Sequence, residues 1–130
     1  MKSIWDNLLV EDEPAVRGLA ALALRRQGYR VLEATNGQEA MLVAQECGGN
    51  AIDLLLTDVV MPRMGGRELA DRLRPLMPQM KVLLSSGFPD QAPAPDEEWN
   101  PGIAFMPKPF TPVVLAQKVR EVLDTPSPEA

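Results

Sequence analysis

The sequence predicts an α/β fold, a doubly wound five-stranded parallel sheet with the strand order 2-1-3-4-5. Apolar strand-like runs alternate with segments whose apolar residues recur at helical spacing, which is typical of βαβ units with right-handed crossovers. The most apolar of these runs, residues 52–57, fits a central strand that is covered on both faces.

The five expected strands are short apolar runs. They cover residues 8–10, 31–34, 52–57, 82–85 and 103–106. Ligands of an open parallel sheet bind outside the carboxyl ends of its strands. The residues that follow these runs are therefore the candidates for function.

In the amino-terminal half of the sequence, specific residues indicate where the helices begin and end. The first helix is expected to begin at Pro14, because the first helical turn leaves its N–H groups unbonded and proline has none. Asp12 is a candidate cap for this helix, and Gly28 can end it. Asn36 is a candidate cap for the second helix, with Glu39 three residues further on as in a capping box.

The carboxyl-terminal half is less regular. A third helix is expected at residues 67–73, and Thr111 followed by proline indicates the start of the last helix, which runs through Val122. Residues 88–96 should hold the fourth helix but contain three prolines, each of which costs roughly 3 kcal/mol in a helix interior. We therefore expect that helix to be shortened, shifted towards residues 96–99, or absent.

Composition excludes several classes of function. A net charge of -5 without a Lys/Arg block predicts no nucleic-acid contact by this domain. No apolar run approaches the roughly 20 residues of a membrane span, so no membrane contact is expected. One cysteine and no signal-peptide pattern favour a cytoplasmic location. The absence of histidine excludes His-dependent catalysis and His-ligated zinc.

Residues suited to phosphoryl chemistry follow four of the expected strands. They are Glu11 and Asp12 after the first strand, Asp58 after the third, Ser86 after the fourth and Lys108 after the fifth. Strands one and three are neighbours, so the three carboxylates should cluster. Two carboxylates ~4 Å apart repel by about 4 kcal/mol at an effective dielectric of about 20, so such a cluster binds protons or a cation. Oxygen ligands of this kind suit Mg²⁺ or Mn²⁺.

Each of these residues also has a purely structural interpretation. Asp58 could form turn hydrogen bonds, and Asp12 could serve only as a helix cap. Ser86 could form a turn, and Lys108 could be a solvated lysine. A cis peptide bond at Pro109 could instead aim the lysine at the carboxylates. Only the combination at four strand ends indicates a phosphoryl site.

The chain resembles the receiver domains of two-component signalling, which have a CheY-like, flavodoxin-like fold. The matching motifs are Leu-Val-Glu-Asp-Glu at 9–13, Asp-Val-Val-Met-Pro-Arg-Met-Gly-Gly at 58–66, Ser-Ser-Gly-Phe at 85–88 and Lys-Pro-Phe at 108–110. We expect an N-terminal extension at residues 1–7, the receiver domain at 8–124 and a disordered tail at 125–130. Residues 105–112 are similar to receivers of hybrid sensor histidine kinases, and the sequence leaves open whether the domain belongs to such a kinase or stands alone.

The resemblance implies a Mg²⁺-dependent phosphorelay in which Asp58 accepts a phosphoryl group. The donor would be a phosphohistidine of a histidine kinase or a histidine phosphotransfer domain. Asp12, Asp58 and the backbone carbonyl of Val60 would ligate Mg²⁺ (or Mn²⁺), and Glu11 would act on the ion through water.

The resemblance also implies a switch. Ser86 would move towards the phosphoryl group, Lys108 would contact that group, and Pro109 would follow a cis peptide bond. Phe105 matches an aromatic residue that reorients on activation. The surface around strands four and five would then change for a downstream protein partner.

Two departures from the family pattern affect the loops. Gly65 replaces a common Asp or Asn, which we expect to be tolerated because all three suit a left-handed backbone. Val60 and Phe88 are apolar at positions where polar residues of the family orient water, which predicts slow loss of the phosphoryl group.

Other functions stay open at this point. The domain could be a degenerate receiver that docks partners without phosphorylation, or an Asp-nucleophile phosphatase of the haloacid dehalogenase type. The second fits poorly, because Glu11-Asp12-Glu13 lacks the Asp-x-Asp pattern of those enzymes. Whether the chain counts as an enzyme, by catalysing its own phosphorylation and dephosphorylation, is equally open.

Overall fold

A parallel sheet forms the centre of the protein. The computed structural model describes residues 6–46, 52–61, 63–77, 79–86 and 103–124. The strands run in the order β2-β1-β3-β4-β5, all parallel, which confirms the predicted topology. The strands are β1 (Asp6–Val10), β2 (Arg30–Ala34), β3 (Leu54–Asp58), β4 (Lys81–Ser86) and β5 (Ile103–Pro107).

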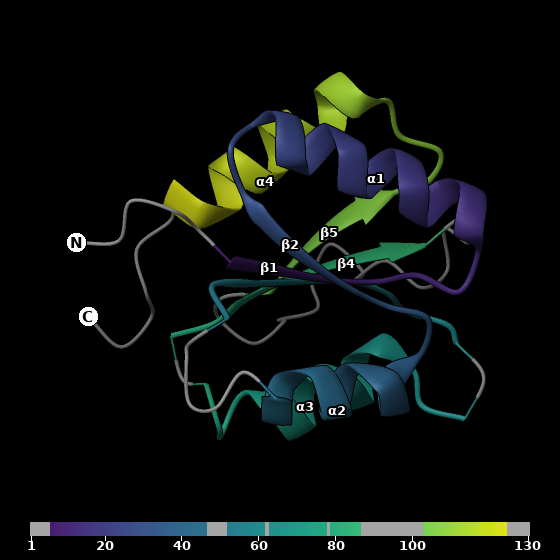
Figure 1. The fold of residues 1–130 in the computed structure, drawn as a ribbon, viewed down its shortest axis with the longest axis vertical. Coiled ribbons are helices and arrows are strands. Elements are labelled where there is room, and N and C mark those ends of the chain that lie inside the picture. The colour runs from purple at the N-terminus through teal and green to yellow at the C-terminus, as the bar shows by residue number, and fades with distance from the viewer. Residues whose placement is uncertain (1–5, 47–51, 62, 78, 87–102, 125–130) are drawn as a thin grey trace, which may run out of the picture.

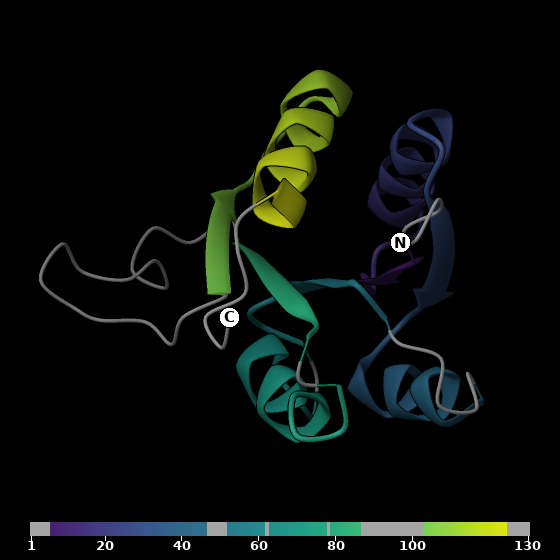
Figure 2. The ribbon, with the colours of Figure 1, turned by 90° about the vertical axis from the view of Figure 1, so that its left-hand side faces the viewer.

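Two helices cover each face of the sheet (Figures 1 and 2). On one face lie α1 (Pro14–Arg26) and α4 (Pro112–Asp124), and on the other α2 (Gly37–Glu46) and α3 (Gly66–Leu73). Side chains of a strand alternate between the faces, so Leu8 belongs to the core beneath α2 and α3, whereas Leu9 belongs to the core beneath α1 and α4. Every residue of β3 is buried, as a central strand requires.

Helix caps were predicted correctly in three of four cases. The Asn36 side chain accepts a hydrogen bond from the backbone of Glu39 at 2.8 Å, and Thr111 accepts one from the backbone of Val114 at 3.1 Å. Gly28 adopts a φ of 92° at the end of α1, where a side chain would be strained. Asp12 does not cap α1, because the cap position is Glu13 and no side chain bonds the first turn there.

The first strand begins two residues earlier than the sequence analysis expected. β1 begins at Asp6, inside the expected N-terminal extension, because the backbone of Asp6 bonds both the amide of Asp53 (2.8 Å) and its side chain (2.7 Å). Residues 88–96, where the sequence analysis expected a shortened, shifted or absent helix, and the expected tail at 125–130 lie outside the described residues. Within the part that the structure describes, no helix has the length and apolar content needed to cross a membrane.

Candidate functional site

The carboxyl ends of the strands bring the predicted residues to one edge of the sheet. Asp58 ends β3 and Ser86 ends β4, while Glu11 and Lys108 directly follow β1 and β5. Backbone hydrogen bonds continue past these ends, from Glu11 to Ala34 (3.1 Å) and from Lys108 to Ser86 (2.9 Å). The backbone is therefore fixed at the point where each functional side chain departs.

Lys108 links two buried carboxylates. Its Nζ lies 2.6 Å from Oε1 of Glu11 and 2.6 Å from Oδ1 of Asp58. The peptide bond from Lys108 to Pro109 is cis. Charge-assisted hydrogen bonds of this length are strong where water is excluded, and both carboxylates are at most 10% exposed. Lys108 thus already occupies the position from which an ammonium can contact a group on Asp58.

Glu11, Asp12 and Asp58 form an acidic cluster. One carboxylate oxygen of each lies within 4.8 Å of the others, with Asp12 exposed and the other two buried. A small divalent cation that keeps several waters needs only one or two carboxylates and a route to solvent, which exposed Asp12 provides. The donor set therefore fits Mg²⁺ or Mn²⁺. Among the described residues, no backbone amide donates to the carbonyl of Val60, which lies in the adjoining loop.

Glu11, Asp58 and Lys108 shift one another's pKa values. Burial, followed by the hydrogen bond and charge of Glu11, raises the pKa of Asp58 to about 7 against the opposing effect of Lys108. Burial also acts to raise the pKa of Glu11, but hydrogen bonds with Asp58 and Lys108 outweigh it and leave that pKa lowered. The pKa of Lys108 is raised, because its bonds to both carboxylates outweigh the effect of burial.

Two glycines let the loop after β3 pass close to Asp58. A Cβ atom on Gly66 would lie 2.1 Å from the backbone oxygen of Asp58, and one on Gly65 would lie 2.7 Å from that of Val59. Gly65 has a φ of -72°, so the expectation of a left-handed backbone there was wrong. The left-handed residue is Arg63, with a φ of 72°. Gly65 and Gly66 therefore allow their backbone to lie close to the backbone oxygens of Asp58 and Val59, where a side chain would not fit.

The expected switch residues lie on the neighbouring strands. Ser86 is buried at the end of β4, and Phe105 in β5 is half-buried against the core beneath α2 and α3. Sequence reasoning missed Arg17, whose guanidinium donates to the backbone oxygen of Glu11 at 2.9 Å and lies 3.5 Å from the carboxylate of Glu33. No local motif marks Arg17, because it reaches Glu11 only once α1 packs on the sheet.

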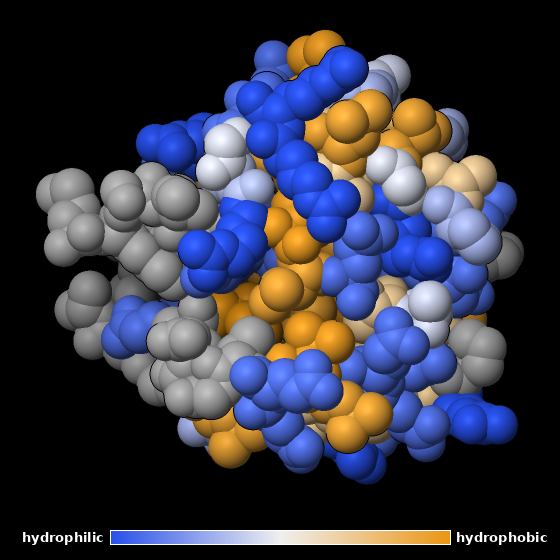
Figure 3. Space-filling model, in the orientation of Figure 1, coloured by the Kyte–Doolittle hydropathy of each residue, from blue (hydrophilic) through white to orange (hydrophobic). Residues whose placement is uncertain are grey.

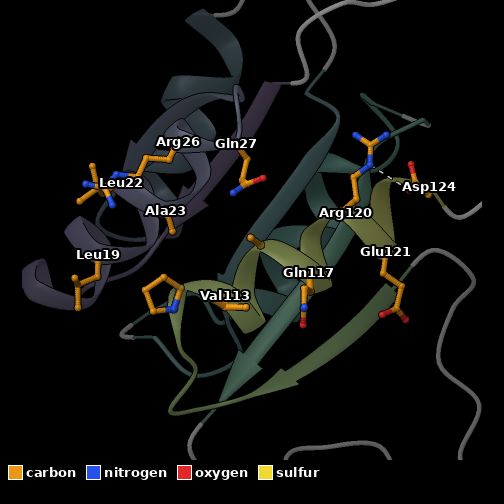
Figure 4. Close-up of a pocket in the computed structure, with 12 residues that line it drawn as sticks. Leu19, Leu22, Ala23, Arg26, Gln27, Val113, Gln117, Arg120, Glu121 and Asp124 are labelled. Carbon is orange, nitrogen blue, oxygen red and sulfur yellow. Dashed lines mark hydrogen bonds and ion pairs between the residues drawn. The ribbon is translucent and has the colours of Figure 1, made fainter.

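A groove of about 820 Å³ runs between α1 and α4 (Figure 4). The exposed apolar side chains of Leu19, Leu22 and Val113 line one part of it, and Figure 3 shows apolar side chains among charged ones over this helical layer. A smaller pocket of about 270 Å³ shares Leu19 and Pro112 with the groove and reaches Lys108. The groove thus leads to the loop that carries the site lysine.

Comparison with known proteins places this site in a family. A model of the response regulator receiver domain matches residues 8–120. The chain is 42% identical over 117 residues to the sensor kinase CckA of Brucella abortus (strain 2308), covering 90% of this chain and 12% of the kinase. It is 35% identical over 116 residues to the response regulator receiver protein CpdR of Brucella abortus (strain 2308), covering 89% of this chain and 94% of CpdR.

Solved structures agree with the sequence comparisons. The receiver domain from the hybrid histidine kinase CckA superposes with a TM-score of 0.77 at 39% identity, covering 92% of this chain and 99% of that one. The response regulator TrrA from Thermotoga maritima, solved in complex with Mg(2+)-BeF, gives 0.74 at 27% identity, covering 91% and 98%. Because the family match spans the whole sheet from Leu8 onward and the strand ends carry the acidic cluster and the lysine, the chain belongs to the response regulator receiver domains of two-component systems.

Proposed function

We propose that this receiver accepts a phosphoryl group on Asp58 from a partner's phosphohistidine and loses it again by hydrolysis. The observation that carries the proposal is the position of the Asp58 carboxylate, which ends the central strand, lies in the acidic cluster and is bonded by Lys108. A nucleophilic carboxylate with a charge-neutralising neighbour is what phosphoryl acceptance requires.

In the transfer, an Asp58 oxygen forms a bond to phosphorus as the bond from phosphorus to the donor nitrogen breaks. The phosphoryl group brings additional negative charge into a cluster that already holds three carboxylates. Lys108 balances part of that charge, because its ammonium lies 2.6 Å from Asp58 before transfer. Mg²⁺, when bound, supplies the remaining positive charge and holds phosphoryl oxygens.

The ligand set that we propose for the ion is Asp12, Asp58 and the carbonyl of Val60, with Glu11 acting through water. The 4.8 Å spacing of the three carboxylates and the exposure of Asp12 support it. Glu11 is the least suited to direct ligation, since Oε1 is held by Lys108 and Oε2 accepts the amide of Glu13 at 3.1 Å.

The output proposed for the phosphorylated state is a change of the surface around β4 and β5. Ser86 ends β4 beside the site, and the amide of Lys108 donates to its backbone oxygen at 2.9 Å. A new charge on Asp58 that attracts the Ser86 hydroxyl and the Lys108 ammonium would draw both strand ends inward. Phe105, on β5, would then change its packing and be read by a downstream protein.

The groove between α1 and α4 is the proposed docking surface for the phosphodonor, a helix that carries the histidine. The donor must reach Asp58, and the groove leads to Lys108 through the pocket that shares Leu19 and Pro112. Replacing exposed Leu19 by Glu should slow transfer from the donor protein and leave phosphorylation by acetyl phosphate unchanged. Equal slowing with both donors would assign Leu19 to the stability of α1 instead.

Intact mass tests the proposed function directly. The protein is incubated with acetyl phosphate, with Mg²⁺ or with EDTA, as wild type and as Asp58→Ala. One added phosphoryl group, formed only with Mg²⁺ and only on the wild type, is the expected result. No adduct together with no beryllofluoride binding would favour a docking module that works without phosphorylation, and an adduct on Asp58→Ala would place the acceptor elsewhere.

A further inference from the structure

A polar cavity of about 390 Å³ lies beside the acidic cluster. Its lining residues are all polar or charged: Asp12, Thr35, Asn36, Gln38 and Arg63. Asp12 follows β1, Thr35 follows β2, and Arg63 lies in the loop after β3, so the cavity belongs to the carboxyl edge of the sheet. Because Asp12 is also the exposed member of the acidic cluster, a charge in this cavity acts directly on the candidate metal site.

Arg63 is the only cation among the described residues that line this cavity. Its side chain is exposed, and its guanidinium has no hydrogen bond or ion pair with any described residue. The other cations at this edge are engaged, since Lys108 is bonded to Glu11 and Asp58, and Arg17 donates to the backbone oxygen of Glu11. The charge of Arg63 is therefore the one that no contact in the site accounts for.

The backbone of Arg63 is left-handed, with a φ of 72°. This conformation is unfavourable for a residue with a long side chain compared with glycine or asparagine. Unfavourable backbone conformations of this kind gather at functional sites. Because Arg63 stabilises the fold neither through its backbone conformation nor through a side-chain contact, its charge is the property that remains to be explained.

The size of the cavity sets the strength of the electrostatic effect. A sphere of that volume is about 9 Å across, a distance at which a guanidinium and a divalent cation still repel each other measurably in water. Salt weakens the repulsion, because the screening length is about 8 Å at physiological ionic strength. Asp12 and Arg63 form no ion pair, so the Asp12 carboxylate stays available to a metal ion that binds beside a positive charge.

We propose that Arg63 sets the charge balance of the site: its guanidinium weakens Mg²⁺ binding to the acidic cluster and strengthens binding of the anionic phosphoryl group on Asp58. Both effects come from one positive charge and therefore have opposite signs. Arg63 ligates neither group and acts through its electrostatic field. The inference rests on the proposed function, because it uses the metal ligands and the acceptor given there.

NMR titrations of isotope-labelled protein at pH 8 measure the two affinities, for Mg²⁺ alone and for beryllofluoride at saturating Mg²⁺. At about 30 mM ionic strength, Arg63→Gln should lower the Kd for Mg²⁺ about two- to threefold. The same variant should raise the Kd for beryllofluoride, which stands in for the phosphoryl group, about 1.5- to twofold. Arg63→Lys keeps the charge and should match the wild type in both titrations. In about 0.5 M NaCl the difference in Mg²⁺ affinity should fall below about 1.5-fold.

Arg26 offers a matched control for the loss of one positive charge. It is exposed and has no ion pair among the described residues. It ends α1, about 18 Å along the helix from Pro14, which lies next to the site. Arg26→Gln should therefore leave both affinities at their wild-type values. Its place in the groove between α1 and α4 does not enter, because both titrations use small ions.

Three results would overturn the role of Arg63. They are equal Mg²⁺ affinities of Arg63→Gln and the wild type, a change of both affinities in the same direction, and an effect of Arg26→Gln as large as that of Arg63→Gln. A wild type that binds no Mg²⁺ would overturn the proposed metal ligands and this inference with them. A wild type that binds Mg²⁺ with the same affinity as Arg63→Gln overturns the role of Arg63 alone.

Discussion

Replacing Asp58 by Asn should remove a pH-dependent loss of stability. The pKa of Asp58 is raised from 3.8 to about 7, mainly by burial, so the folded protein holds this proton more tightly than the unfolded chain does. The stability that this bound proton contributes is present in full below the pKa of Asp58 in the unfolded chain, and it is lost as the pH rises to about 7. Each pKa unit corresponds to 1.36 kcal/mol, so the rise from pH 5 to 8 without Mg²⁺ should cost the wild type roughly 2–3 kcal/mol.

Two features of the chain isolate this effect. It contains no histidine, so no other side chain is expected to change charge mainly in this window. The lowered pKa of Glu11 acts at a lower pH, because the stability that it contributes is lost only as the pH falls below 4.5, the ordinary pKa of a glutamate. The slope between pH 5 and 8 therefore reports Asp58.

The assay is urea unfolding in EDTA at pH 5 and pH 8. Wild type should be less stable at pH 8, and Asp58→Asn should be nearly flat and more stable than wild type at that pH. Asp71→Asn, which removes an exposed carboxylate from α3, should keep the wild-type slope. A flat wild type, or the same slope in Asp58→Asn, would refute the assignment of a buried, proton-holding carboxyl at this position.

Three further outcomes follow from the site. Gly66→Ala should destabilise the fold by about 2 kcal/mol or more in urea unfolding, because its Cβ would lie 2.1 Å from the Asp58 backbone oxygen. Gly18→Ala, which has open space around the added Cβ, should stabilise the fold by about 0.5–1 kcal/mol. Similar effects of the two substitutions would contradict the close approach at Gly66. Val60→Asn should speed loss of phosphate from Asp58 in a release time course, because the exposed Val60 side chain offers no group to orient water, and an unchanged rate would remove this explanation. Millimolar Mg²⁺ should raise the unfolding midpoint of the wild type at pH 8, and Asp12→Asn should abolish that rise, since it removes the exposed member of the acidic cluster. A rise that Asp12→Asn retains would place the ion elsewhere.

The fold was predictable because its signals are local. The alternation of apolar runs with helical spacing required a parallel sheet, and Asn36, Thr111 and Gly28 marked helix ends through interactions within a few residues. The residues at four strand ends could be gathered in advance, since parallel strands present their carboxyl ends at one edge. Where a boundary depended on a distant partner, as at Asp6 with Asp53, the sequence carried no signal.

By itself the sequence determined the topology, the family and the set of residues at the sheet edge, because periodicity and motif order survive without coordinates. Only the tertiary structure decided how those residues interact. It placed Lys108 between Glu11 and Asp58, showed that Gly66 serves a close backbone approach, and put Arg63 in one cavity with Asp12. Such distances depend on how strands and helices pack around one another, which no local pattern of residues encodes.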